Sequence, residues 1–335
     1  MSADAPHFIG IGAQKAGTTW LYRNLQEHPE VWLPPEKELH YFDEKRIARR
    51  SLVGRAFGRT VEGARWRRQL RRHARGALRG TSFAELRWLG RYFLLGWDDG
   101  WYASLFAPGH GRSTGEVTPS YAILESEHVA GIRELLPEAK IVFLLRNPIE
   151  RAWSHAMMEV RNTGASEADR DDFLRHFEEP RSTLRTDYAR TIEIWESHYP
   201  ADQIFVGFLE DIHFHPEELL TRVCRFLGVA PLDRWPNAAS RVYGGSGATI
   251  PGELAVALAE LYRAPLHELA SRFGGYASWW RFCAEHLVDE RPTGGVPAQL
   301  FTSPLWDAWL AGRGNMPPAP QSAPLSELAL SQRTA

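Results

Sequence analysis

The chain has 335 residues, with 39 lysines and arginines against 41 aspartates and glutamates, a formal charge of −2 and 44% hydrophobic residues. This composition supports one large or two modest globular domains and excludes disorder as the main state. Two cysteines, Cys224 and Cys283, can close at most one disulfide, which excludes a disulfide-stabilised scaffold and favours a reducing compartment. The near-zero charge is unevenly distributed, because Lys45 to Arg91 carries fourteen arginines against Glu62 and Glu85.

Apolar runs in the sequence are short. Ile141 to Leu145 and Ile204 to Leu209 have the length of strands, and no run approaches the roughly 18 residues of a membrane span. The N-terminal MSADAP lacks the charged and apolar regions of a secretory signal. We therefore expect a cytoplasmic protein.

Strands and helices alternate along the chain. The pattern predicts a strand at Phe8 to Ile11, a glycine turn and a helix that ends near His28. A second strand at Ile141 to Leu145 leads into a helix near Pro148, and a third strand is predicted at Ile204 to Leu209. Further helices are predicted at Glu127 to Leu136, Tyr188 to His198, Pro216 to Leu227 and Gly252 to Phe273. Such alternation is typical of a parallel sheet with helices on both faces.

A glycine-rich turn connects the first strand to the first helix. Gly12 and Gly17 have the spacing that opens a nucleotide-binding P-loop, but Lys15 lies inside the loop and Thr18 follows the second glycine. Such a turn directs backbone N–H groups and the positive end of the helix dipole at one point, where a phosphate binds. A nucleoside-triphosphate hydrolase also needs a strand-end carboxylate for magnesium, whereas the second strand ends in Arg146. The pattern therefore favours a phosphate site without a metal.

Three segments match motifs of one enzyme family. Gln14 to Trp20 has the sequence QKAGTTW, Arg146 to Ser154 has RNPIERAWS, and Pro35 to Asp43 has PEKELHYFD. The first resembles the 5′-phosphosulfate loop, and the second the 3′-phosphate motif, of sulfotransferases that use 3′-phosphoadenosine 5′-phosphosulfate (PAPS). The third resembles the catalytic stretch of the branch that includes heparan sulfate sulfotransferases and many bacterial relatives. The resemblance covers roughly residues 7 to 280.

The resemblance assigns roles to the residues of these motifs. It implies that PAPS is the sulfuryl donor, that adenosine 3′,5′-bisphosphate is the product, and that no metal is needed. The expected donor-binding residues are Lys15, Ala16, Gly17, Thr18, Thr19, Trp20, Arg146, Ser154 and, in a late glycine-rich segment, Arg241. Trp20 has an equally good interpretation as a core residue of the first helix, while the resemblance implies that it contacts adenine.

Sulfuryl transfer needs a base for the acceptor proton and positive charge where the leaving phosphate becomes more negative. Lys15 and the N–H groups of its loop supply the positive charge. By resemblance, Glu38 is the general base. His40 shares a face with Glu38 in an extended segment and orients the acceptor or neutralises the transferred oxygens. If Glu38 is not the base, His40 is the alternative.

The sequence thus predicts an α/β, P-loop-like, three-layer fold with a central parallel sheet, and a PAPS-dependent sulfotransferase. The acceptor is expected to be a small molecule or a glycan, with a hydroxyl or amine on a carbohydrate, a lipid-linked molecule or a natural product. Val117 stands where heparan-type enzymes carry a lysine, which disfavours a heparan-like contact. The rival hypotheses are a P-loop kinase or nucleotide hydrolase, and a nucleotide-binding module without turnover.

The predicted catalytic domain spans residues 1–290 and includes a basic helical insertion at about residues 45–100. Residues 291–335 are rich in proline and are expected to be loosely packed or disordered. In the insertion, apolar residues fit one stripe of a helix at Trp66, Leu70, Ala74 and Leu78.

The arginines of the insertion have three interpretations. The first is a solvated face over the acceptor site. The second is peripheral contact with an anionic membrane, which would suit a lipid-linked acceptor. Nucleic acid is not expected as a partner, because no recognised module or stacking array accompanies the arginines.

Overall fold

The computed structural model describes residues 5–44, 61–77, 82–95, 98–163, 169–240 and 249–331. Its central sheet contains β1 (Phe8–Gly12), β2 (Val31–Trp32), β3 (Ser113–Val117), β4 (Lys140–Leu145), β5 (Ile204–Phe208) and β8 (Ala323–Pro324). The strand order is β2-β3-β1-β4-β5-β8. Strands β1 to β5 are parallel, and β8 pairs antiparallel with β5.

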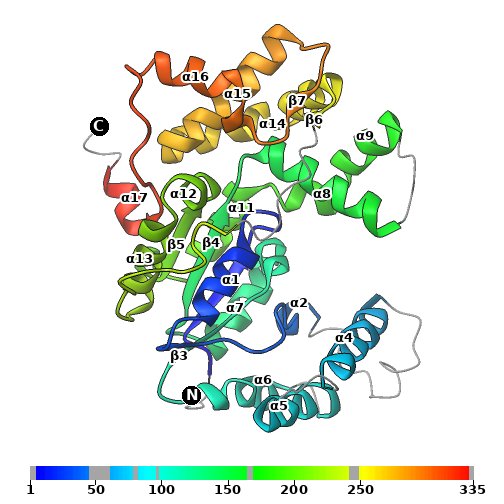
Figure 1. Cartoon of the computed structure of the whole chain (residues 1–335), viewed down its shortest axis with the longest axis vertical. Helices are drawn as coiled ribbons and strands as arrows, with labels where there is room; N and C mark the ends of the chain where they lie inside the picture. The colour runs from blue at the N-terminus through cyan, green and yellow to red at the C-terminus, as the bar shows by residue number, and fades with distance from the viewer. Residues whose placement is uncertain are drawn as a thin grey trace.

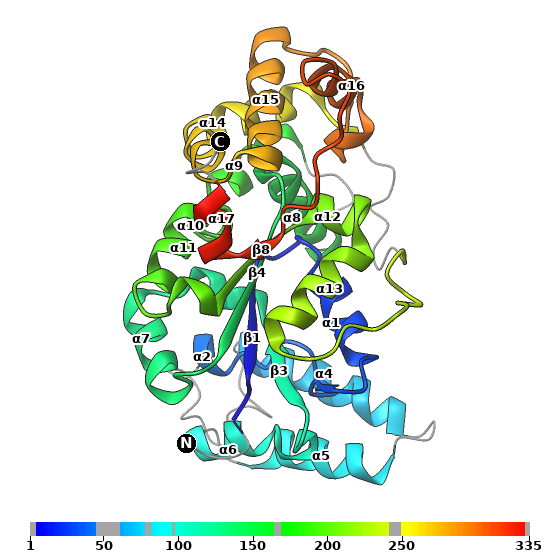
Figure 2. The ribbon, with the colours of Figure 1, turned by 90° about the vertical axis from the view of Figure 1, so that its left-hand side faces the viewer.

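Helices cover both faces of this sheet and give three layers (Figures 1 and 2). One face carries α1 (Thr18–Gln26), α12 (Leu209–Phe214) and α13 (Pro216–Leu227), and the other carries α7 (Ser126–Leu135) and α11 (Tyr188–Glu196). The remaining connections contain α2 (Tyr41–Glu44), α8 (Pro148–Thr163), α9 (Arg170–Glu178), α10 (Pro180–Leu184), η1 (Ala107–Gly109), η2 (Pro119–Ile123) and η3 (Ala201–Gln203). The predicted α/β fold with a central parallel sheet is confirmed.

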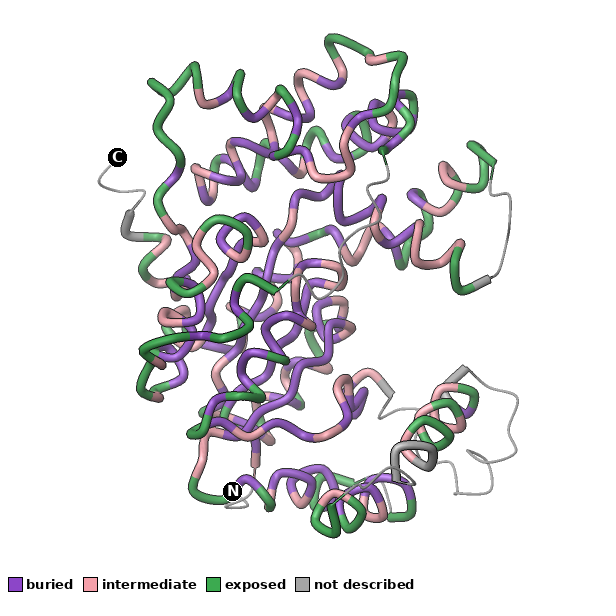
Figure 3. The backbone as a smooth tube through the Cα atoms, viewed as in Figure 1, coloured by how far each residue is buried: buried purple, intermediate pink, exposed green. Residues whose placement is uncertain are grey.

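The strands form where the sequence has short apolar runs. Every residue of β1 and β5 is buried, as is every residue of β4 after Lys140. Burial on both faces is expected for parallel strands between two helical layers. Figure 3 shows this buried centre, with exposed residues on the outer sides of the peripheral helices. The three predicted strands are confirmed, and the predicted helix at Pro216 to Leu227 coincides with α13.

The described part of the basic insertion is helical, as predicted, and lies at the opposite end of the molecule from α14, α15 and α16 (Figure 1). Its described helices are α4 (Val61–Ala77), α5 (Phe83–Leu94) and α6 (Asp99–Ser104). Trp66 packs edge-on against Phe93, with ring centroids 5.6 Å apart. The predicted apolar stripe is nevertheless wrong at Leu70, which is 38% exposed. Leu78 and the side chain of Ala74 lie outside the described residues.

The C-terminal segment is folded, contrary to our expectation of a loose tail. It follows α14 (Gly252–Phe273) and α15 (Gly275–Glu290), and it contains β7 (Val296–Pro297), η4 (Leu300–Thr302), α16 (Pro304–Ala311), β8 and α17 (Leu325–Ser331). Strand β7 pairs with β6 (Thr249–Ile250), and β8 extends the central sheet. Leu300, Phe301, Trp306 and Trp309 are buried and anchor the segment. Pro297 and Pro324 lie in the edge strands β7 and β8, where a missing N–H is tolerated.

The structure also bears on the cysteines and on the question of a membrane-spanning helix. Cys224 and Cys283 are both buried and form no disulfide. Among the described residues, no helix combines the length and the apolar character that a membrane crossing requires.

Candidate active site

The candidate residues gather at one edge of the sheet. Because β2, β3, β1 and β4 are parallel neighbours, the segments that follow them emerge at the same edge. In strand order these segments carry Glu38 and His40 after β2, Ser120 after β3, Lys15 after β1 and Arg146 after β4. The topology therefore brings together motifs that lie more than 100 residues apart.

The loop between β1 and α1 has the form expected of a phosphate-binding loop. Gly17 is the N-cap of α1 with φ of 92°, and a Cβ atom there would lie 2.4 Å from Ile212 Cδ1. The backbone conformation therefore favours glycine here, and the Ile212 side chain of α12 packs directly against it. No side chain of the described residues caps α1, so the N–H groups of its first turn face the site. Ala16 is fully buried and donates its N–H to Ala13 within the loop.

The other predicted residues of this loop differ in exposure. Thr18 is buried and Thr19 is partly exposed in the first turn of α1. Trp20 is 4% exposed, and its indole Nε1 donates to the carbonyl of Ala238 at 2.7 Å. This bond fixes the segment that leads toward Arg241, which lies outside the described residues. The contact of Trp20 with adenine stays a prediction.

Positive charge is concentrated beside the loop. Burial lowers the pKa of Lys15, and the guanidinium groups of Arg146, Arg161 and Arg151 lower it further. Arg146 Nη1 donates to the Lys15 carbonyl at 3.2 Å, so the strand end and the loop are in direct contact. Ser154 is partly exposed in the second turn of α8. Such crowding of like charges favours an anionic ligand, which would relieve it.

A buried arginine that we did not predict reinforces this cationic region. Arg151 is fully buried; its Nε donates to Thr186 Oγ1 at 2.7 Å and its Nη2 to the Ser182 carbonyl at 3.2 Å. Its Nη1 is buried and has no hydrogen-bond partner among the described residues. Arg151 lies inside the RNPIERAWS motif, so the motif itself was the signal that could have identified it.

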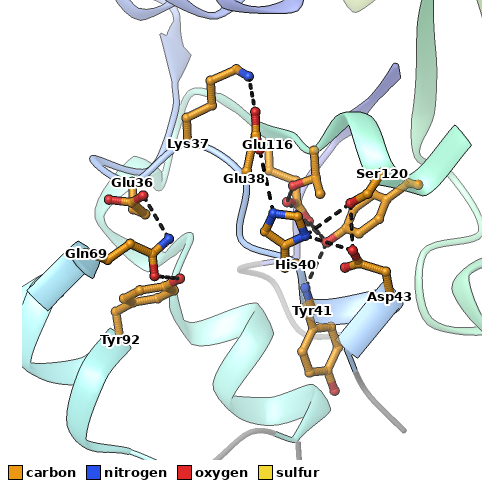
Figure 4. Close-up of polar contacts among 12 residues, drawn as sticks. Glu36, Lys37, Glu38, His40, Tyr41, Asp43, Gln69, Tyr92, Glu116 and Ser120 are labelled. Carbon is orange, nitrogen blue, oxygen red and sulfur yellow. Dashed lines mark hydrogen bonds and ion pairs between the residues drawn. The ribbon is translucent and has the colours of Figure 1, made fainter. Parts of the chain in front are cut away.

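The predicted catalytic segment forms a compact cluster of ionisable groups (Figure 4). Glu38 Oε1 accepts from Lys37 Nζ at 2.6 Å, and Glu38 Oε2 lies 3.6 Å from His40 Nε2. On its other side, His40 Nδ1 contacts Asp43 Oδ2 at 2.7 Å. Ser120 Oγ donates to the same Asp43 oxygen at 2.6 Å. His40 therefore lies between two carboxylates.

The backbone of this segment differs from the extended chain that we expected. Glu38 and His40 have φ values of 66° and 56°, in the left-handed region that non-glycine residues seldom adopt. The turn that results still directs both side chains to each other. Strained backbone of this kind is more frequent at functional sites than elsewhere.

The charge states of this cluster follow from its contacts. Burial would raise the pKa of Glu38, but the hydrogen bond with His40 and the charge of Lys37 outweigh burial and lower it to about 2. Burial would lower the pKa of His40, but the hydrogen bonds with Asp43 and Glu38 raise it to about 9. At neutral pH the cluster therefore holds an ionised Glu38, which is 40% exposed, beside a protonated His40.

A buried carboxyl group, that of Glu116, is connected to the catalytic segment through hydrogen bonds. Glu116, in β3, is 1% exposed and accepts hydrogen bonds from Tyr102, Tyr121 and Thr118 at 2.6 to 3.3 Å. Burial raises the pKa of Glu116 to about 7, although these hydroxyls oppose the effect. The Tyr121 hydroxyl also accepts from the Tyr41 backbone N–H at 3.0 Å, which fixes the start of α2. Val117 beside it is 1% exposed, and its side chain packs against Gly10 of β1.

The basic insertion is attached directly to the catalytic segment. Glu36 is 4% exposed and accepts from Gln69 Nε2 at 3.0 Å (Figure 4). It also accepts from His73 Nε2 at 2.5 Å and from Arg72. These hydrogen bonds attach α4 to Glu36, which lies two residues before Glu38 in the sequence. The inward face of α4 therefore uses polar side chains where we expected Leu70.

Arg185 connects the two halves of the site electrostatically. Burial and the charge of Arg151 lower the pKa of Arg185 to about 10, while Asp43 and Glu38 act in the opposite direction. Arg185 thus lies within electrostatic range of both the cationic region and the catalytic cluster. Neither Arg185 nor Asp43 was predicted as a site residue, although Asp43 lies in the PEKELHYFD segment.

Comparisons with known proteins agree with these motifs. A model of the sulfotransferase family matches residues 6–234. A bifunctional heparan sulfate N-deacetylase/N-sulfotransferase of Drosophila melanogaster is 30% identical over 115 residues, which are 31% of this chain and 11% of that protein. The membrane-associated sulfotransferase kil1 of Dictyostelium discoideum is 28% identical over 149 residues, which are 44% of this chain and 22% of that protein. The matches thus span about a tenth and a fifth of the length of these relatives.

A solved sulfotransferase from Alicyclobacillus acidocaldarius shares 22% identity, with a TM-score of 0.49. The match covers 85% of this chain and 96% of that chain. The family model matches more than half of the present sequence. This protein therefore belongs to the sulfotransferase family.

Proposed function

We propose that this protein transfers the sulfuryl group of PAPS to a hydroxyl or amine of its acceptor. The observation that carries the proposal is the contact of Glu38 with Lys37 at 2.6 Å and with His40 at 3.6 Å, at the sheet edge that also carries the Lys15 loop. A nucleotide-binding module without turnover would have no use for a carboxylate kept ionised at this place. The family membership supports the same reaction class.

The residues present fit the two charged ends of PAPS. Lys15 and the N–H groups of Gly17, Thr18 and Thr19 would bind the 5′-phosphosulfate, because the uncapped start of α1 attracts anions. Arg146 and Ser154 would bind the 3′-phosphate. The unpartnered Nη1 of the buried Arg151 supports an anion in this region, because a buried guanidinium N–H without an acceptor is costly.

The chemistry assigns one task to each group. The acceptor oxygen or nitrogen forms a bond to sulfur while the bond from sulfur to the bridging phosphate oxygen breaks in line. The acceptor proton goes to Glu38, and the electron pair of the broken bond remains on the 5′-phosphate of adenosine 3′,5′-bisphosphate. Lys15 stabilises this leaving phosphate, and the charge of His40 stabilises the oxygens of the transferred group.

Calorimetry separates this proposal from its nucleotide-binding rivals. We expect adenosine 3′,5′-bisphosphate to bind in the presence of EDTA, and ATP to bind poorly with or without magnesium. Tight binding of ATP that requires magnesium would favour a P-loop kinase or nucleotide hydrolase and would overturn the proposal.

Turnover and the acceptor class are tested together. The protein is incubated with PAPS labelled in its sulfuryl group and with fractionated cell extracts, and labelled products are identified by mass spectrometry. We expect a carbohydrate, a lipid-linked molecule or a natural product to gain a sulfonate. Binding of adenosine 3′,5′-bisphosphate without label transfer in any fraction would favour a non-catalytic module.

A further inference from the structure

Glu150 connects three parts of the molecule that meet at the proposed 3′-phosphate site. It lies in the first turn of α8 and is fully buried. Its Oε2 lies 3.1 Å from both Nε and Nη2 of Arg146. Its Oε1 accepts the backbone N–H of Leu300 at 2.8 Å. Since Arg146 Nη1 donates to the Lys15 carbonyl, the guanidinium is fixed on two sides.

Leu300 provides a rigid donor for this contact. It is fully buried at the start of η4, and its carbonyl accepts from Ser303 Oγ at 2.6 Å. The next residue, Phe301, packs on α12, with its ring centroid 4.4 Å from that of His213. Helix α12 in turn packs on the phosphate loop, where Ile212 lies against Gly17. The C-terminal segment, which contacts Glu150 through Leu300, is therefore also connected through α12 to the loop that contains Lys15.

We propose that Glu150 is a positioning residue that orients the Arg146 guanidinium toward the 3′-phosphate, and that Leu300 couples this subsite to the C-terminal segment. The inference rests on the proposed function, in which Arg146 binds that phosphate. A guanidinium held in one plane by a carboxylate loses less rotational freedom when it binds a second anion. Leu300 lies outside residues 6–234, so the family model does not describe this contact.

The variant Glu150→Gln tests the positioning role. It keeps the size of the side chain and an acceptor for Leu300, but it removes the charge that orients Arg146. Calorimetry compares adenosine 3′,5′-bisphosphate with adenosine 5′-monophosphate, which lacks the 3′-phosphate. We expect the Kd of the bisphosphate to rise about tenfold, as for one charged hydrogen bond, with the Kd of the monophosphate unchanged. The matched control is Glu253→Gln, which removes a surface ion pair with Arg170 and should change neither Kd.

The outcomes separate this inference from the proposed function. If the wild-type protein binds both nucleotides equally, Arg146 does not read a 3′-phosphate and the proposed function fails. If the wild type prefers the bisphosphate and Glu150→Gln keeps that preference in full, the positioning role is overturned while the proposed function stands.

A second measurement uses the wild-type protein and does not depend on how the variant folds. Hydrogen exchange is followed for the peptide that contains Leu300, with each nucleotide at saturation. We expect the bisphosphate to slow exchange of the Leu300 amide more than the monophosphate does, because the 3′-phosphate fixes Arg146 and hence Glu150. Equal protection by the two nucleotides would overturn the coupling to the C-terminal segment.

Discussion

His40 and its two carboxylate neighbours determine how the proton can move. A histidine that contacts Asp43 at 2.7 Å and Glu38 at 3.6 Å is protonated at neutral pH, so it has no free lone pair for the acceptor proton. Glu38 keeps its charge because Lys37 and His40 stabilise it. The geometry therefore favours Glu38 over His40 as the proposed base and leaves His40 as a fixed positive charge.

The pKa of His40 can be measured without knowing the acceptor. We expect NMR titration of its imidazole to give a midpoint near 9, and Asp43→Asn to lower this midpoint by removing the largest favourable contact. Because the folded value lies above the ordinary value of 6.5, the contact stabilises the protein fully below pH 6.5. That stabilisation is lost as the pH rises through about 9. A His40 midpoint near or below 6.5 in the wild type would contradict the assignment.

The role of Glu38 is tested by Glu38→Gln. We expect kcat for sulfuryl transfer to fall by about 10² to 10⁴, the usual contribution of a general base. The Kd of adenosine 3′,5′-bisphosphate should stay within twofold, because Glu38 does not contact the proposed phosphate sites. Glu127→Gln, an exposed change on α7, serves as the control. Full turnover in Glu38→Gln would exclude Glu38 as the base.

Helix α4 is an element whose position depends on one buried residue. Glu36 holds it through Gln69, Arg72 and His73, while Trp66 supplies the apolar contact with Phe93. We expect Glu36→Gln to accelerate tryptic cleavage within residues 65–72 about tenfold, because loss of a charged hydrogen-bond network favours local opening. Mass spectrometry of the fragments gives the rate at each arginine. An unchanged rate, equal to that of Glu127→Gln, would show that Glu36 does not hold the helix.

The insertion carries both charged and apolar side chains that are exposed. Arg68 and Arg71 are exposed on α4, and Phe83 and Leu94 of α5 are 83% and 62% exposed. We expect this surface to bind anionic vesicles with a strong dependence on salt, since each arginine near such a surface contributes about 1 kcal/mol. Co-sedimentation with phosphatidylserine vesicles across a salt series measures this binding, and the double variant Arg68→Glu/Arg71→Glu should abolish it.

The control for vesicle binding changes arginines elsewhere on the surface. Arg175 of α9 and Arg181 of α10 are also exposed, and their replacement by glutamate should leave binding intact. If the wild-type protein stays in the supernatant at low salt, the arginines of α4 are a solvated face beside the acceptor site.

At the scale of the whole molecule, local features were predictable from the sequence. The units β1 to α1 and β4 to α8 each consist of an apolar run, a turn and a helix in one continuous segment, so their pattern is visible in the sequence. Strand β3 was missed because Gly115 and Glu116 interrupt any apolar run. The burial of Glu116 depends on the hydroxyls of Tyr102 and Tyr121, and the fold creates these contacts.

Contacts between distant segments were not predictable from the sequence, because only the fold brings the two residues together. Ser120 lies 77 residues from Asp43 in the sequence, and Leu300 lies 150 residues from Glu150. The C-terminal segment was misjudged because proline, serine and alanine are typical of linkers, whereas a few buried groups such as Phe301 are enough to anchor it. Composition averages over a segment, but packing depends on individual side chains.

The C-terminal segment is attached to the central sheet through Asp211. Asp211 is fully buried after β5; its Oδ2 accepts from Gln321 N, Ser322 N and Ser322 Oγ at 2.6 to 2.9 Å, and its Oδ1 accepts from the Tyr276 hydroxyl at 3.0 Å. We expect Asp211→Asn to lower the free energy of unfolding by about 3 kcal/mol, because it weakens four hydrogen bonds to one buried charge.

In the wild type, urea unfolding followed by tryptophan fluorescence and by far-UV circular dichroism should coincide. Four of the ten buried tryptophans in the described part of the chain, Trp279, Trp280, Trp306 and Trp309, lie in the C-terminal region, so part of the fluorescence change reports on that region. In Asp211→Asn, where β8 is held less firmly to β5, the fluorescence transition should occur at lower urea than the dichroism transition. Coincident transitions at the wild-type midpoint in this variant would show that Asp211 does not join the two parts.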